Sequence, residues 1–173
     1  MNGLRHGHSK VSRGFTLLEA VTVIAITCIL LAAAIPSYQH MLQRRQLQQV
    51  AELLALDMRH ARELSVSENQ LIHISYRAGK KWCWGVSRNQ PCDCSGNTPG
   101  ARCNIAQMDS KEYPRVLLDI AQDSAFSPGL GQVAQTGAAA FRTERGQNLR
   151  VQLNPLGRPQ VCGRDAPGGV ACP

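Results

Sequence analysis

One apolar run near the N-terminus constrains this chain more than any other feature. Residues 15–35 are 21 positions with a single charged side chain, Glu19, and Arg5, Lys10 and Arg13 precede them. About 20 apolar residues in a helix cover roughly 30 Å of hydrocarbon, so the run is long enough to cross a membrane. A carboxylate within such a run is costly unless it finds a partner. The run therefore predicts a membrane helix in which Glu19 has a specific role.

Two simpler interpretations of this run are a secretory signal peptide and a plain transmembrane anchor. A signal peptide has a shorter apolar region without an acid, followed by small residues at its cleavage site. The three alanines at residues 32–34 resemble such a site. A signal peptide is nevertheless disfavoured by the length of the run, by Glu19 and by the proline that follows. The positive residues before the run favour a cytoplasmic N-terminus, which places everything after the run outside.

The residues that open the run carry a specific resemblance. Residues 13–19 read Arg-Gly-Phe-Thr-Leu-Leu-Glu and resemble the cleavage and methylation motif of type IV prepilins and pseudopilins. The resemblance implies that a prepilin peptidase cuts between Gly14 and Phe15 and methylates the new amino group, while the apolar run stays on the mature protein. It also implies that Glu19 pairs with the N-terminal amine of a neighbouring subunit, which relieves the buried charge only on assembly.

We expect three segments. Residues 1–14 are a cleaved leader, residues 15–35 are the transmembrane half of a long helix, and residues 36–173 are one periplasmic domain that includes the second half of this helix. Three of the positive charges leave with the leader, so the formal charge of +7 becomes +4 in the mature chain. This modest excess is compatible with an anionic partner.

The periodicity of apolar residues predicts an α+β fold. A spacing of three or four continues to residue 64, which indicates one helix over residues 15–65 with Pro36 inside it. From residue 71 the period is two. Strands are predicted at residues 71–76, 82–86, 115–120, 138–142, 149–153 and 158–162, and residues 88–112 are interpreted as a polar loop. The expected fold is a long N-terminal helix packed on an antiparallel β-sheet domain.

Six cysteines lie in the exported part of the chain: Cys83, Cys92, Cys94, Cys103, Cys162 and Cys172. An even set in an oxidising compartment predicts disulfides. Cys162 with Cys172 is the favoured pair, and the other four would pair among themselves and staple the loop. A zinc site with four thiolate ligands is the alternative, which the tight Cys-x-Cys spacing at 92 and 94 disfavours.

No motif in the sequence points to catalysis. It contains no Gly-x-Ser-x-Gly elbow, no glycine-rich phosphate loop and no His-Glu-x-x-His. We therefore expect neither an enzyme nor a cofactor or metal.

The C-terminal part of the chain is basic. Residues 141–173 carry a net charge of +3, with Glu144 and Asp165 set against Arg142, Arg145, Arg150, Arg158 and Arg164. If the strands here form an antiparallel sheet, several of these arginines could line one face and bind DNA phosphates through Coulomb attraction. The alternative is a solvated basic face with no ligand.

Three further stretches, residues 58–65, 82–86 and 153–158, resemble the GspH/FimT group of minor pilins and pseudopilins. The GspH side resembles tip pseudopilins of type II secretion. The FimT side resembles minor pilins of type IV pili, some associated with DNA uptake through a Gly-Arg-x-Arg motif. The matching positions here are Gly157, Arg158, Pro159 and Gln160, so Gln160 replaces the second arginine and Arg164 can supply the charge from the tail.

The sequence thus predicts a FimT-like minor pilin that assembles into or primes a type IV pilus. We expect a single-pass protein of the inner membrane with a periplasmic C-terminal domain. Its expected partners are other pilins and the prepilin peptidase, with double-stranded DNA as a candidate ligand. A GspH-like pseudopilin of type II secretion is the first alternative, and a membrane-anchored periplasmic domain unrelated to filaments is the second.

Overall fold

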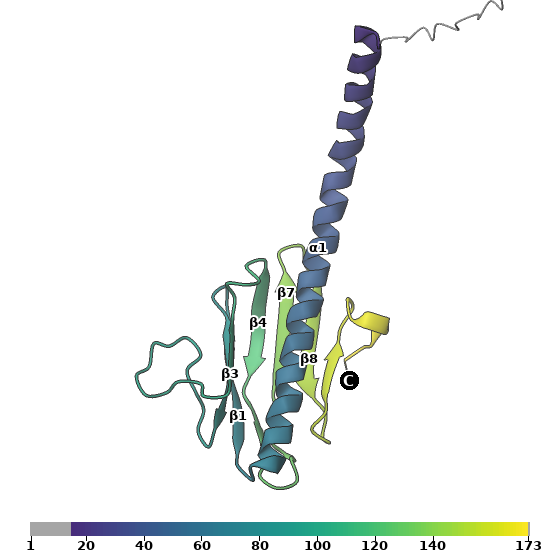
Figure 1. Cartoon of the computed structure of the whole chain (residues 1–173). Coiled ribbons are helices and arrows are strands. Elements are labelled where there is room, and N and C mark those ends of the chain that lie inside the picture. The colour runs from purple at the N-terminus through teal and green to yellow at the C-terminus, as the bar shows by residue number, and fades with distance from the viewer. Residues whose placement is uncertain (1–14, 173) are drawn as a thin grey trace, which may run out of the picture. The chain divides into compact units, whose positions relative to one another are not determined.

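The computed structural model describes residues 15–172 and contains one long helix, α1 (Leu17–Ser67), followed by strands (Figure 1). The chain divides between Gln39 and His40 into two compact units. The predicted long helix is confirmed, with Pro36 inside it. Gly14 and the rest of the predicted leader lie outside the described residues.

The N-terminal unit is the apolar half of α1. The helix begins at Leu17 because the Thr16 hydroxyl accepts a hydrogen bond from the backbone N–H of Glu19 at 3.3 Å, which caps the first turn. Every residue from Phe15 to Met41 is exposed. An 18-residue window has a mean hydropathy of 2.5, so α1 is long and apolar enough to cross a membrane.

The second half of α1 belongs to the C-terminal unit and buries one stripe. Its buried residues recur at helical spacing, as expected for an amphipathic helix that packs on a core; they are Gln43, Leu47, Val50, Ala51, Leu54, Ala55, Met58, Ala61 and Ser65. Leu53 and Leu64 are only half-buried at the margin of this stripe. The chain leaves the helix through Asn69, whose φ of 51° is the left-handed conformation common after helix ends.

The C-terminal unit contains two antiparallel sheets. The five-stranded sheet has the order β3-β2-β1-β5-β6, from β1 (Ile72–Arg77), β2 (Cys83–Arg88), β3 (Ala106–Asp109), β5 (Ser124–Phe126) and β6 (Val133–Gln135). The four-stranded sheet has the order β4-β7-β8-β9, from β4 (Val116–Gln122), β7 (Ala138–Thr143), β8 (Asn148–Leu153) and β9 (Pro159–Cys162). A short 3-10 helix, η1 (Pro167–Gly169), follows.

The structure differs from the sequence prediction in three strands. Strand β3 lies inside residues 88–112, where the sequence predicts only loop, and pairs with β2. Strands β5 and β6 were not predicted and have three residues each. Such short segments are too brief to establish an alternating pattern, so their strand conformation comes from pairing with β1 and with each other.

An aromatic cluster joins both sheets to the helix. Trp82 and Trp84 stack with ring centroids 5.3 Å apart, and Phe141 from β7 meets both rings edge-on. The Trp82 indole N–H donates to the Val116 carbonyl at 2.7 Å, and the Trp84 indole N–H donates to the Asp57 carboxylate of α1, also at 2.7 Å. The two tryptophans thus bury large apolar surface without leaving an indole N–H unpaired.

Candidate functional site

The residues predicted to mediate assembly lie at the start of α1. Glu19 is exposed and makes no ion pair within residues 15–172. Its neighbours satisfy their own polar groups locally, since the Thr22 hydroxyl donates to the Glu19 carbonyl and the Thr27 hydroxyl donates to the Val23 carbonyl. Glu19 is therefore the one charge from Phe15 to Ile35, and it has no partner in the described part of its own chain.

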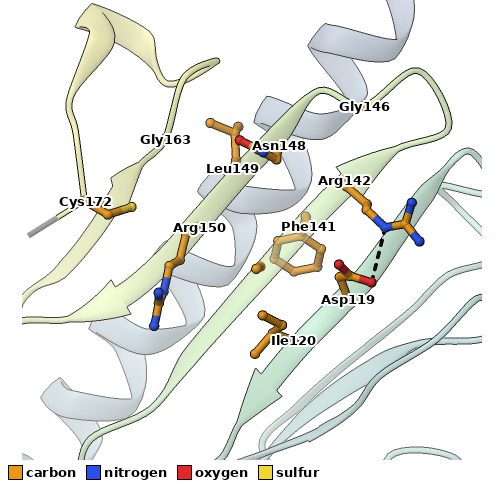
Figure 2. A pocket seen from close by; sticks show the side chains of 11 residues that line it. Asp119, Ile120, Phe141, Arg142, Gly146, Asn148, Leu149, Arg150, Gly163 and Cys172 are labelled. Carbon is orange, nitrogen blue, oxygen red and sulfur yellow. Dashed lines mark ion pairs between the residues drawn. The ribbon is translucent and has the colours of Figure 1, made fainter.

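Two of the predicted arginines lie on the outer face of the four-stranded sheet (Figure 2). Arg142 on β7 and Arg150 on β8 are both exposed, whereas Phe141 and Leu149 next to them are buried in the core. The register sets Arg150 opposite Ala140, two residues before Arg142. Both side chains border a shallow recess of about 340 Å³.

These two arginines differ in their surroundings. The Arg142 guanidinium lies 3.2 Å from the Asp119 carboxylate of β4, with both side chains about half exposed. Arg150 makes no ion pair within the described residues. Arg145 lies in the turn between β7 and β8, and Arg164 follows β9.

Acidic residues nearly balance this group of arginines. The Asp165 carboxylate accepts a hydrogen bond from the backbone N–H of Asn148 at 2.9 Å. This bond brings the C-terminal segment that contains Arg164 close to the turn that contains Glu144 and Arg145. Together with Asp119, three carboxylates accompany the four arginines 142, 145, 150 and 164. These seven residues together therefore carry an excess of only one positive charge.

Arg158 lies elsewhere, in the turn between β8 and β9. Its N–H donates to the Asn154 side chain at 2.8 Å, and the Asn154 N–H donates to the Arg158 carbonyl at 3.0 Å. Arg158 borders a notch of about 330 Å³ together with Arg59, Arg62 and Glu63 of α1. The structure thus separates Arg158 from the other four predicted arginines.

The notch is held by close packing between α1 and two loops. The Arg62 Nε–H donates to the Gly131 carbonyl at 3.1 Å. Gly157 is buried with a φ of 75°, and a Cβ there would lie 3.2 Å from the Gly131 carbonyl oxygen and 3.4 Å from the Arg62 Nε. Only glycine fits this position comfortably. Sequence reasoning missed Arg59 and Arg62, although their separation of three residues on a helix places them on one face.

All six predicted disulfide cysteines are paired, as Cys83–Cys94, Cys92–Cys103 and Cys162–Cys172. The last is the pair that the sequence favoured. Because these thiols are joined as disulfides, they are not the four thiolates that the zinc alternative required. Among residues 15–172, the structure brings no three His, Cys, Asp or Glu side chains together as a metal site.

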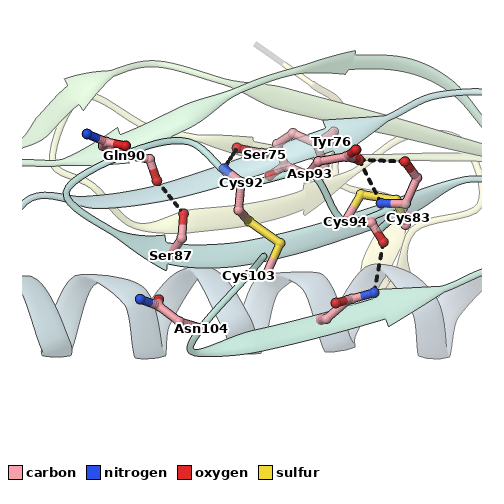
Figure 3. The surroundings of a disulfide bond; sticks show 12 residues. Ser75, Tyr76, Cys83, Ser87, Gln90, Cys92, Asp93, Cys94, Cys103 and Asn104 are labelled. Carbon is pink, nitrogen blue, oxygen red and sulfur yellow. Dashed lines mark hydrogen bonds between the residues drawn. A yellow bond between two sulfur atoms is a disulfide. The ribbon is translucent and has the colours of Figure 1, made fainter. Parts of the chain in front are cut away.

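Two of these disulfides fasten residues 89–104 over the outer face of β2 (Figure 3). The Cys92–Cys103 disulfide lies directly on Gly85, where a Cβ would overlap the Cys103 sulfur. Ser87 on the same face is buried, and its hydroxyl donates to the Gln90 carbonyl at 2.6 Å. The loop thus covers this face of the sheet although it contains no large apolar residue.

Asp93 organises the loop from within. Its carboxylate accepts hydrogen bonds from the hydroxyl and the backbone N–H of both Ser95 and Thr98, at 2.5 to 2.9 Å. These donors, with the Ser95 hydroxyl foremost, hold the pKa of Asp93 well below its usual value. The loop is therefore an ordered polar structure, fixed by hydrogen bonds and two disulfides.

Comparisons with known proteins bear on the N-terminus and on the fold. Residues 9–35 match the family model described as the prokaryotic N-terminal methylation motif. The crystal structure of the Pseudomonas aeruginosa (strain PAO1) type IV minor pilin FimU in space group P21 is similar, with a TM-score of 0.51 and 17% identity, over 71% of this chain and 92% of that one. A second FimU structure, in space group P65, has a TM-score of 0.49 and 18% identity, over 69% and 95%. No curated protein sequence matches the chain significantly.

Proposed function

We propose that this chain, which combines an N-terminal methylation motif with a type IV pilin fold, is a minor subunit of a type IV pilus. The observation that carries the proposal is the N-terminal unit itself. Its residues from Phe15 to Gln39 are exposed around the whole helix, yet Glu19 is their only charge. A helix of this kind needs a membrane or neighbouring helices to cover it.

In this proposal the membrane and the filament are successive environments of the same helix. Before assembly, residues 15–35 would span the inner membrane once, with the disulfide-bonded domain in the periplasm. Cleavage after Gly14 would make Phe15 the methylated N-terminus. Glu19 would then pair with the amino group of a neighbouring pilin, which relieves the cost of the buried carboxylate only in the assembled state.

Two substitutions test this role. Gly14→Ala should leave the leader attached, and mass spectrometry of the purified full chain would then find residues 1–14 still present. Glu19→Val should be cleaved normally but lose co-purification with sheared pili, because the apolar helix still enters the membrane while the charge pair is lost. An uncleaved wild-type chain, or a Glu19→Val chain recovered in pili at the wild-type level, would refute the proposal.

A GspH-like pseudopilin of a type II secretion system is the alternative role, because the same N-terminal helix serves either filament. Deletion of the gene separates the two. Loss of surface pili with normal protein secretion supports the pilus subunit. Loss of exported proteins with intact pili supports the pseudopilin.

DNA binding is a finer candidate function, and the notch is the surface that favours it. Three arginines, Arg59, Arg62 and Arg158, face one carboxylate there, an excess of two positive charges. The outer face of the four-stranded sheet has an excess of one. Arg62 is held in place through its Nε, so its terminal nitrogens remain available for a phosphate. We therefore propose that DNA phosphates contact the notch first, with Arg150 and Arg164 as a secondary contact.

Duplex DNA binding by the full chain in detergent tests this candidate at low and moderate salt. Arg59→Gln/Arg158→Gln and Arg150→Gln/Arg164→Gln remove the same charge from two different places. We expect the first pair to lose about tenfold or more in affinity and to flatten the salt dependence, since each lost phosphate contact reduces the counterions released. Equal losses in both pairs would indicate diffuse attraction, and a wild type that does not bind at low salt would remove DNA from the proposed function.

A further inference from the structure

A second recess lies on the five-stranded sheet and shares no residue with the arginine surfaces described above. Its volume is about 580 Å³, which is within the range of small-molecule sites. Strands β1, β2 and β3, the turns that follow β1 and β3, and the disulfide-bonded loop all contribute to it.

The floor of the recess is formed by one row of residues that are paired across three neighbouring strands. Cys83 on β2 is the register partner of both Arg77 on β1 and Asp109 on β3. Trp82 and Trp84, on either side of Cys83, are buried in the core. Because side chains alternate along a strand, Cys83 and its cross-strand partners face the other side, where the loop lies.

One wall is fixed by a covalent bond. The Cys83–Cys94 disulfide attaches the loop to the floor, and Ser95 and Asn97 follow it along the recess. The Gln107 side-chain amide of β3 donates to the Cys94 carbonyl at 2.8 Å, which ties the same wall to the next strand. The recess is thus part of an ordered structure.

The recess carries more positive than negative charge. Lys111 lies 3.4 Å from the Asp109 carboxylate, and its backbone N–H donates to the same group at 2.8 Å. Arg77 and Lys81, from β1 and the turn after it, make no ion pair within residues 15–172. Two cations are therefore left to meet an anion, and the guanidinium of Arg77 can hold a carboxylate or a phosphate through two hydrogen bonds.

The remaining lining favours a polar ligand. Ser110 and Asn97 supply a hydroxyl and an amide, which pair well with hydroxyl groups. Trp82 is fully buried and offers no exposed ring for stacking. We propose that this recess binds an anionic sugar unit, meaning a sugar that carries a carboxylate or a phosphate. The proposal does not depend on the filament role or on DNA.

Ligand-detected saturation-transfer NMR on the full chain tests this proposal, in a detergent without a sugar head group. The probes are glucuronate and glucose 6-phosphate, with glucose, acetate and inorganic phosphate as controls. We expect at least one of the two anionic sugars to bind about tenfold more tightly than glucose and than the bare ion with the same charged group. The stronger of the two identifies the carboxylate or the phosphate as the preferred group.

Charge-matched variants locate the binding. Arg77→Gln/Lys81→Gln should weaken the preferred probe about tenfold, whereas Arg150→Gln/Arg164→Gln removes the same charge elsewhere and should leave it unchanged. Both pairs alter exposed residues without ion pairs in the described structure, so we expect both to fold, which circular dichroism checks. Cys83→Ser/Cys94→Ser releases the wall and should also weaken binding.

Three results would overturn the proposal. The first is no binding of either anionic sugar, and the second is binding no tighter than that of glucose or of the bare ions. The third is an equal loss in the two charge-matched pairs, which would indicate attraction to the net charge of the protein. None of these measurements requires cleavage or assembly. The sugar-binding proposal can therefore be refuted while the pilus proposal is supported, and the pilus proposal can be refuted while sugar binding is supported.

Discussion

The two sheets of the C-terminal unit differ in whether the face turned away from the core is covered. Each has one face in the core and one face turned away from it. On the five-stranded sheet the outer face is covered, so that Cys83 and Ser87 are buried beneath the loop. On the four-stranded sheet the outer face is open, and Arg142 and Arg150 stand exposed on it.

The difference shows that a loop of polar residues needs cross-links to remain ordered over a sheet. The covering loop has no large apolar side chain, so burial of its own residues cannot offset the entropy lost when it is ordered. Two disulfides and the hydrogen bonds to Asp93 supply that order instead. The open sheet needs no cover, because polar and charged side chains on its outer face remain in water.

Removal of a loop disulfide should have the largest effect on this arrangement. Cys92→Ser/Cys103→Ser should lower the free energy of unfolding by about 2–4 kcal/mol, measured by denaturant titration. Cys162→Ser/Cys172→Ser is the matched control, since the two pairs close loops of nearly the same length, with separations of 11 and 10 residues. We expect the loop pair to cost more, because it also uncovers β2. Equal costs would mean that chain entropy alone explains both.

A side chain at Gly85 should have the next largest effect. Its Cβ would overlap the Cys103 sulfur and lie 3.0 Å from the Cys92 sulfur, so Gly85→Ala should destabilise the oxidised protein by about 1–3 kcal/mol, as overpacking does. In the Cys92→Ser/Cys103→Ser background the same change should cost clearly less. Additive costs in this double-mutant cycle would show that the disulfide does not rest on Gly85.

The link between α1 and the five-stranded sheet should make stability depend on pH. Burial raises the pKa of Asp57 above its usual value, although the hydrogen bond from Trp84 and the charge of His60 lower it. The folded protein therefore holds this proton more tightly than the unfolded chain. This contribution to stability is present at low pH and is lost as the pH rises from the unfolded-state pKa through the folded-state pKa.

Asp57→Asn removes this titration, and its side-chain oxygen can still accept the Trp84 hydrogen bond. We expect the difference in free energy of unfolding, variant minus wild type, to increase as the pH rises from about 4 to about 7, because only the wild type loses the Asp57 contribution. Asp93→Asn is a control with the opposite expected sign. The pKa of Asp93 is lowered in the folded protein, so its contribution to stability is present at higher pH and is lost as the pH falls. A pH-independent difference between Asp57→Asn and the wild type would contradict this account.

The smallest effect belongs to the open sheet. The pair between Arg142 and Asp119 is about half exposed, and such surface ion pairs contribute roughly 0–1 kcal/mol. Arg142→Gln should therefore leave the denaturation midpoint nearly unchanged, and added salt should reduce any difference further. A loss comparable to that of Gly85→Ala would show that the outer face of the four-stranded sheet contributes to folding.

Much of the fold could be predicted because it depends on local patterns. The long helix follows from the apolar run and the helical spacing after it, and the four-stranded sheet follows from alternation in segments close to those expected. Strands β3, β5 and β6 could not be found in this way, because they are short and depend on partners distant in the chain. The same limit applies to the candidate sites, since Arg59 and Arg62 lie almost a hundred residues from Arg158.

The sequence alone was enough to determine the two-part helix, the α+β class, the set of disulfide cysteines and the presence of five arginines near the C-terminus. Each of these rests on composition or on the spacing of neighbours. Only the tertiary structure decided the pairing of the loop cysteines, the separation of Arg158 from the other four arginines, and the recess beside Cys83–Cys94. These depend on strand register and on loops brought together by the fold, and a local pattern contains no information on distances of that kind.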